Sequence, residues 1–138
     1  MARSKLLLEA HLKALRLPTF LREYDKLARQ CAAESLDSRS FLQQLCELEL
    51  LDREQRATDR RIKAAKFPVT KSLDTFNFPA LPALNKKLVL ELARCEFIDR
   101  RENVLALGNS GTGKTHIGLA LGLAACQRGY RVRFTTAA

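Results

Sequence analysis

An eight-residue loop constrains the fold of this chain more than any other feature. Residues 108–115 read Gly-Asn-Ser-Gly-Thr-Gly-Lys-Thr, which fits the pattern Gly-x-x-x-x-Gly-Lys-[Ser/Thr] at every fixed position. A short apolar run, Asn103–Leu107, precedes the loop, and a helical pattern over Ile117–Gln127 follows it. The flanks therefore predict a buried strand, a phosphate-binding loop and a helix, in that order.

The spacing of the loop suits a nucleoside triphosphate. Several backbone amides must approach the phosphate oxygens at once, so we expect positive φ angles at Gly108, Gly111 and Gly113. The helix that follows would add its unpaired amides and the positive end of its dipole. The predicted nucleotide-binding residues are the loop and its next neighbour: Gly108, Asn109, Ser110, Gly111, Thr112, Gly113, Lys114, Thr115 and His116.

Within this set, Lys114 would neutralise the β and γ phosphates, and the Thr115 hydroxyl would coordinate Mg²⁺. ATP with Mg²⁺ is the expected cofactor pair. For His116, a packing or solvent-facing role is favoured over a nucleotide contact. Hydrolysis also needs a second acidic residue and a cation for the developing charge, and the sequence identifies neither. We therefore assign no catalytic residue and expect binding rather than turnover.

Residues 4–66 are expected to be almost entirely helical, because Leu, Ala, Glu, Lys, Arg and Gln dominate there and no glycine occurs before Gly108. Three helices are predicted: one at about 4–17, a second that starts after Pro18-Thr19 and ends near Ala33, and a third at 37–66. Their expected core faces carry these residues: Leu8, Leu12 and Leu15; Phe20, Tyr24, Leu27 and Cys31; Phe41, Leu42, Leu45, Leu48 and Leu51.

We divide the chain into a helical domain at 1–66, a proline-containing linker at 67–82 and a partial nucleotide-binding core at 83–138. A further helix is predicted at about 85–93, and the alternating residues 131–136 predict a second strand. The expected fold class is α + α/β. The helical domain is followed by the start of a parallel-sheet core that stops after its second strand.

The formal net charge of +9 suggests a polyanionic partner. Between Arg53 and Lys71, seven bases stand against two acids. A basic helix end of this kind suits DNA, and a solvated helix face is the alternative interpretation. The candidate DNA-binding residues are Arg53, Arg56, Arg60, Arg61, Lys63 and Lys66.

Other classes of protein are disfavoured by composition. The apolar runs are too short to cross a bilayer, and the amino terminus lacks a secretory apolar core, so we expect a cytoplasmic protein without membrane contact. The four cysteines are scattered and the chain has two histidines, a pattern that does not predict a metal-ligand cluster.

Several stretches together resemble one family. They are Leu15-Arg16-Leu17-Pro18, Arg60-Arg61-x-Lys63-x-x-Lys66-Phe67-Pro68, Leu73-Asp74-x-Phe76-x-Phe78, Phe97-Ile98, Gly111-Thr112-Gly113-Lys114-Thr115-His116 and Gly129-Tyr130-Arg131-Val132-x-Phe134-Thr135-Thr136-Ala137. In these stretches the chain resembles the IstB-like ATP-binding proteins, the helper ATPases of insertion-sequence transposition, which are related to DnaC-type helicase loaders in the AAA+ class.

The resemblance implies a helical amino-terminal domain, an AAA+ core, and homo-oligomers of the full-length protein that bind DNA and engage a transposase. It also implies that Phe97 and Ile98 border the adenine. The second acidic motif, the polar sensor and the arginine finger of such proteins are absent from these 138 residues, so the chain is expected to be an amino-terminal fragment. A helicase loader, and a helical interaction module with an ATPase remnant, remain alternatives; a small-molecule kinase is disfavoured.

Overall fold

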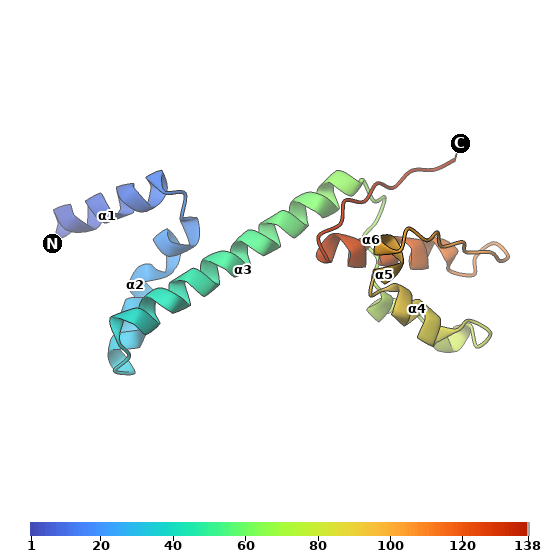
Figure 1. Ribbon diagram of the computed structural model, residues 1–138, viewed down its shortest axis with the longest axis horizontal. Coiled ribbons are helices and arrows are strands. Elements are labelled where there is room, and N and C mark those ends of the chain that lie inside the picture. The colour runs from blue at the N-terminus through green and yellow to red at the C-terminus, as the bar shows by residue number, and fades with distance from the viewer. Residues whose placement is uncertain (138) are drawn as a thin grey trace. The chain divides into compact units, whose positions relative to one another are not determined.

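The structure, a computed structural model, describes residues 1–137. Every regular element among them is a helix, and Figure 1 shows their order along the chain. The elements are α1 (Ala2–Ala14), α2 (Pro18–Ala33), α3 (Ser38–Ala65), η1 (Leu73–Thr75), η2 (Phe78–Ala80), α4 (Lys86–Leu92), α5 (Glu96–Asp99) and α6 (Lys114–Gln127), where η denotes a 3-10 helix. They form two compact units, Met1–Ala57 and the chain from Thr58 onward.

The core of the first unit lies between α2 and α3. Its buried residues Leu27, Cys31 and Leu45 are surrounded by Phe20, Tyr24 and Phe41. This confirms the predicted apolar face of α2 and the first part of the face of α3. The prediction that Leu42, Leu48 and Leu51 of α3 also face the core was wrong, because all three are exposed. Of the three leucines predicted to face inward on α1, only Leu12 is buried.

A buried carboxylate joins α2 to α3. Glu49 of α3 is 4% exposed, and its Oε2 accepts a 3.0 Å hydrogen bond from the backbone N–H of Thr19. The Thr19 hydroxyl donates to Asp52 at 2.7 Å. Helix α2 begins at Pro18 without a side-chain cap from its own N-cap residue. The two acids of α3 therefore supply the negative charge and the acceptors that the first turn of α2 needs.

The limits of α3 follow from its end residues. Asp37 Oδ1 accepts a 2.9 Å hydrogen bond from the backbone N–H of Ser40 and so caps the start of the helix. The helix ends at Ala65, and Lys66 takes a left-handed conformation with φ of 62° just before Phe67-Pro68. The predicted helix over 37–66 is therefore confirmed within a residue at each end.

Helix α6 is the most deeply buried element of the second unit. Its buried residues are Leu119, Ala120, Leu121, Leu123, Ala125 and Cys126. Near its carboxyl end, Arg61 Nε donates a 2.8 Å hydrogen bond to the carbonyl of Cys126. Phe67 packs on the backbone of Gly122, where an added Cβ would lie 2.9 Å from the Phe67 ring. The end of α3 and the residues after it are thus fixed to α6.

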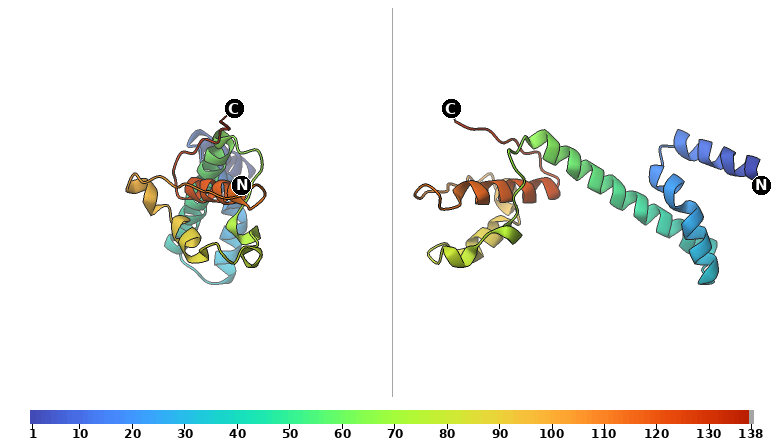
Figure 2. Two further views of the ribbon diagram at one scale, coloured as in Figure 1. Left: turned by 90° about the vertical axis from the view of Figure 1, so that its right-hand side faces the viewer. Right: turned by 180° about the vertical axis from the view of Figure 1, so that it is seen from behind.

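The predicted parallel sheet was wrong. Residues 102–109 and 130–137 form no strand in the described part of the chain, so the fold class is all-helical rather than α + α/β. Figure 2 shows the red carboxyl-terminal segment as an irregular trace in two further views. The reason is that a strand needs a neighbour for its backbone groups. Phe134 N–H instead donates to the carbonyl of Ala65 at 2.8 Å.

The two expected strands differ in burial. In the first, Leu105 and Leu107 are 83% and 91% exposed, so this apolar run was wrongly predicted to be buried. In the second, Val132 and Phe134 are half-buried while Arg131 and Arg133 are exposed. The alternating pattern therefore correctly places the inward side chains of the second run, although no ladder forms around them.

The segment between α3 and α6 consists of short turns. The predicted linker, 67–82, contains η1 and η2. Asn85 Oδ1 accepts from the backbone N–H of Leu88 at 3.1 Å and caps α4, which confirms the helix predicted at about 85–93. Helix α5 was not predicted. None of the helices among residues 1–137 combines the length and apolar composition needed to cross a membrane.

Candidate nucleotide-binding site

The loop before α6 is shaped by two glycines in conformations that other residues avoid. Gly111 has φ of 76° and Gly113 has φ of 88°, as predicted. Gly108 does not share this property, and its predicted positive φ was wrong. The absence of a side chain at Gly108 leaves room for Thr112, because an added Cβ would lie only 3.2 Å from the Thr112 hydroxyl.

Lys114 is the first residue of α6, and its ammonium folds back over the loop. Its Nζ donates to the carbonyls of Gly108 at 2.8 Å and Asn109 at 2.5 Å. The Thr112 hydroxyl donates to the same Asn109 carbonyl at 2.8 Å. A positive charge, the loop backbone and the unpaired amides of a helix N-terminus therefore meet at one place, which is an arrangement that binds anions.

The residues after Lys114 differ in what they contact. Thr115 is exposed at the start of α6, so its hydroxyl can reach a ligand at the loop. His116 points elsewhere: its Nε2 lies 2.9 Å from the Ser72 carbonyl, and its ring lies 5.1 Å from that of Phe76. The structure thus gives His116 a packing role against the linker, which is the role that the sequence favours.

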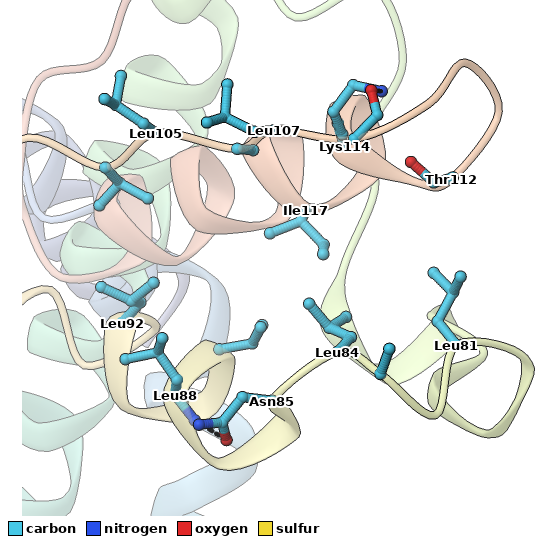
Figure 3. A pocket seen from close by; sticks show the side chains of 15 residues that line it. Leu81, Leu84, Asn85, Leu88, Leu92, Leu105, Leu107, Thr112, Lys114 and Ile117 are labelled. Carbon is cyan, nitrogen blue, oxygen red and sulfur yellow. Dashed lines mark hydrogen bonds between the residues drawn. The ribbon is translucent and has the colours of Figure 1, made fainter.

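A pocket of about 420 Å³ adjoins the loop. Figure 3 shows α4 and the preceding turn on one side, with Ile117 of α6 pointing toward Leu84, while Leu105 and Leu107 point away from the hollow. Thr112 and Lys114, which belong to the loop, line the edge of the pocket. The pocket is mostly apolar, so it offers a surface for the flat face of a base beside a phosphate site. Phe97 and Ile98 are not among its lining residues.

The basic residues predicted to bind DNA fall into two groups. Three of them serve the fold: Arg53 and Arg56 form ion pairs with the buried Glu49 at 3.1 and 3.3 Å, and Arg61 binds the carboxyl end of α6. The other three, Arg60, Lys63 and Lys66, are exposed. Arg60 and Lys63 are three residues apart on α3 and hence lie on one helix face.

Comparison with known proteins decides the family. The model of the family described as IstB-like ATP binding protein matches residues 10–138. The chain belongs to this family. The IstB-like match includes the loop, α6 and most of the helices before them.

IstB-like relatives occur in several bacteria. A Geobacillus stearothermophilus protein, named for ATP binding and for insertion sequence IS5376, is 37% identical over 123 residues, which cover 89% of this chain and 49% of that protein. A Pseudomonas aeruginosa protein named for insertion sequence IS21 is 39% identical over 127 residues, with 92% and 48% covered. A Bacteroides fragilis relative is 31% identical over 136 residues, with 99% and 68% covered. The chain spans about half the length of the first two.

The sequence alone did not reveal the role of Phe76. Its ring packs against Gly113 of the loop, and the contact joins residues that are far apart in the sequence. The available signal was a pair of aromatic residues, Phe76 and Phe78, in a segment interpreted as a linker. Two large apolar side chains in a linker indicate a docking contact.

Proposed function

We propose that this chain is an ATP-binding, DNA-binding helper protein of insertion-sequence transposition. The observation that carries the proposal is the loop of residues 108–115, with Lys114 held at the start of α6. Membership of the IstB-like family and the ATP-binding names of the relatives support ATP as the nucleotide. The insertion-sequence names support transposition over helicase loading, and a transposase is the protein partner that we propose.

The residues present fit Mg-ATP. The loop is open at Gly111, where nothing lies within 4 Å of an added Cβ, so phosphate can approach its backbone. Lys114 would exchange its two carbonyl partners for phosphate oxygens, which form stronger charge-assisted hydrogen bonds. The exposed Thr115 hydroxyl would hold one coordination position of Mg²⁺, which usually keeps waters and takes one or two protein ligands beside the phosphates.

Calorimetry with Mg-ATP tests the nucleotide site. The wild-type chain is expected to bind, and Lys114→Ala is expected to weaken binding about 10- to 100-fold, because a charged hydrogen bond contributes about 1.5–3 kcal/mol. Thr115→Val should reduce the gain in affinity from added Mg²⁺. The control is Lys13→Ala, which removes an exposed lysine of α1. Absence of binding by the folded wild-type chain, or equal binding by Lys114→Ala, would contradict the proposal.

For DNA, the proposed contacts are the exposed basic residues at the carboxyl end of α3 and just after it: Arg60, Lys63 and Lys66. Replacing Arg60, Lys63 and Lys66 together by alanine should weaken duplex binding and lower the slope of log affinity against log salt by about three, since each phosphate contact contributes about 0.9. A matched control removes the same charge from three other exposed positions: Arg3, Lys13 and Lys87. If both triple variants lose the same affinity, net charge alone explains the binding and the assigned contacts are wrong.

A second candidate is a helical protein-interaction module. It is favoured by leucines that the first unit leaves exposed, among them Leu50 and Leu51 at 66% and 68%. A module of this kind would capture a transposase or a replicative helicase without nucleotide, and Lys114→Ala would not change the capture. Dependence of capture on Mg-ATP would favour the ATP-dependent helper.

A further inference from the structure

The linker contacts the start of α6 through the backbone carbonyl of Ser72. The Ser72 carbonyl lies 2.9 Å from His116 Nε2 and accepts a 3.1 Å hydrogen bond from the Thr75 hydroxyl. A carbonyl oxygen can only accept, so Nε2 of His116 must carry the hydrogen and donate it. The bond joins a turn of the linker to the third residue of α6. It spans 44 positions in the sequence.

Phe76 makes the second contact. Its ring stands edge-on to the His116 imidazole, with an interplanar angle of 86°. A Cβ added to Gly113 would lie 2.7 Å from Phe76 Cε2, so the ring rests directly on the loop backbone. Phe78 supports Phe76 with a centroid distance of 4.8 Å. Gly113 is the N-cap of α6 and has a left-handed backbone, which makes it the point where the loop becomes a helix.

The middle of the loop and the start of α6 are therefore held differently. No atom lies within 4 Å of a Cβ added to Gly111, whereas Gly113 is covered by Phe76 and His116 is tied to Ser72. The amides of Gly113 and of the first turn of α6 are among those expected to meet a triphosphate. A contact that fixes these amides before a ligand arrives lowers the ordering cost of binding.

We infer that Phe76 and His116 are positioning residues, which hold Gly113 and the first turn of α6 in the geometry that receives phosphate. This inference rests on the proposed nucleotide-binding function and names the residues that prepare the site. Neither side chain contacts the nucleotide in this account. They act through the backbone of the loop, and the linker segment Ser72–Phe78 serves as a strap over the start of α6.

The test uses the full chain with three variants, Phe76→Leu, His116→Leu and His116→Gln, and the control His11→Leu on the exposed face of α1. Glutamine carries an N–H that can replace the hydrogen bond to Ser72, whereas leucine cannot. Hydrogen exchange of backbone amides is measured without nucleotide. Affinity is then measured for Mg-ATP and for inorganic tripolyphosphate.

Phe76→Leu and His116→Leu are expected to speed exchange at residues 111–116 and to weaken binding of both probes about three- to tenfold. His116→Gln should restore affinity to within about twofold of wild type. Unchanged exchange and affinity in both leucine variants would overturn the inference. So would faster exchange throughout α6 without rescue by glutamine, because that result indicates a general loss of packing.

A different outcome would show that the proposed nucleotide binding is wrong. If the wild-type chain binds neither Mg-ATP nor tripolyphosphate, nucleotide binding is excluded, and the exchange data decide alone whether the strap holds the loop. Faster exchange confined to residues 111–116 would then support the strap, and no local change would overturn it.

Discussion

Glu49 of α3 is 4% exposed, and its carboxylate accepts a hydrogen bond from the first turn of α2. Burial of this group raises its pKa, but hydrogen bonds from Thr19 and Arg53 outweigh burial and leave the pKa of Glu49 lowered. Hydrogen bonds from Thr19 and Arg22 likewise lower the pKa of Asp52. Both carboxylates therefore favour the folded state when they are ionised.

The first unit should lose stability in acid. Because the folded-state pKa values of both acids lie below the unfolded ones, their contribution is complete above about pH 5 and disappears as pH falls through the folded values. Glu49→Gln should lower the free energy of unfolding at pH 7 by about 1–3 kcal/mol and flatten its decline in acid. Circular dichroism during urea unfolding measures both effects. Glu47→Gln, at an exposed position of α3, should behave as wild type.

Residue types in the loop predicted the positive φ angles of Gly111 and Gly113, but not the contacts that support the loop. Lys114 and Gly113 lie where the spacing requires them, because the loop conformation is a local property of glycine and of the helix that follows. The contact of Phe76 with Gly113 depends on the path of the linker, which no local pattern encodes. The sequence also did not separate the basic residues from one another, since the ion pairs of Arg53 and Arg56 depend on the burial of Glu49.

Among the elements, α3 and α6 are joined where each of them ends. Arg61 Nε donates to the Cys126 carbonyl at 2.8 Å, and its NH2 group donates to the Thr58 hydroxyl at 3.0 Å. A guanidinium at the carboxyl end of α6 adds a second donor to a carbonyl that the Gly129 N–H also reaches at 3.2 Å, and it opposes the negative end of the helix dipole. Its neighbour Arg60 is exposed.

Two adjacent arginines should therefore have different effects. Arg61→Ala should lower the free energy of unfolding by about 1–2 kcal/mol, because it removes a helix cap and packed side-chain carbons. Arg60→Ala should change stability by less than about 0.5 kcal/mol, as is usual for an exposed residue, and should weaken DNA binding. Thermal unfolding and DNA titration on both variants test the pair. Equal effects of the two variants in both assays would contradict the assignment of Arg61 to stability and of Arg60 to DNA binding.

The helices were predictable because their signals are local. Apolar spacing, the Asp37 cap and the Phe67-Pro68 break determine α3 almost alone. Strands are different, since Val104 and its neighbours can form a ladder only with segments that are distant in the sequence. The alternation at 131–136 still oriented Val132 and Phe134 inward, so the periodicity was informative while the pairing was not. Helix α5, with only 4 residues, is too short for any periodic signal.

At the scale of the whole molecule, the exposed apolar run at 103–107 stands out. Leu105 and Leu107 present most of their surface to solvent beside the pocket. The chain spans about half the length of the Geobacillus stearothermophilus and Pseudomonas aeruginosa relatives, and it consists of two compact units. The stability of each unit is best measured with a probe that reports on that unit alone.

The four thiols supply such a measurement. Cys46 is exposed, whereas Cys31 lies in the core of the first unit and Cys95 and Cys126 are buried in the second. Burial also raises the pKa of Cys95 and Cys126, which keeps them protonated. A maleimide reagent should therefore modify Cys46 within minutes and the others only when their unit opens. Mass spectrometry of peptides would time the opening of each unit separately; rapid labelling of Cys126 in the native chain would contradict this expectation.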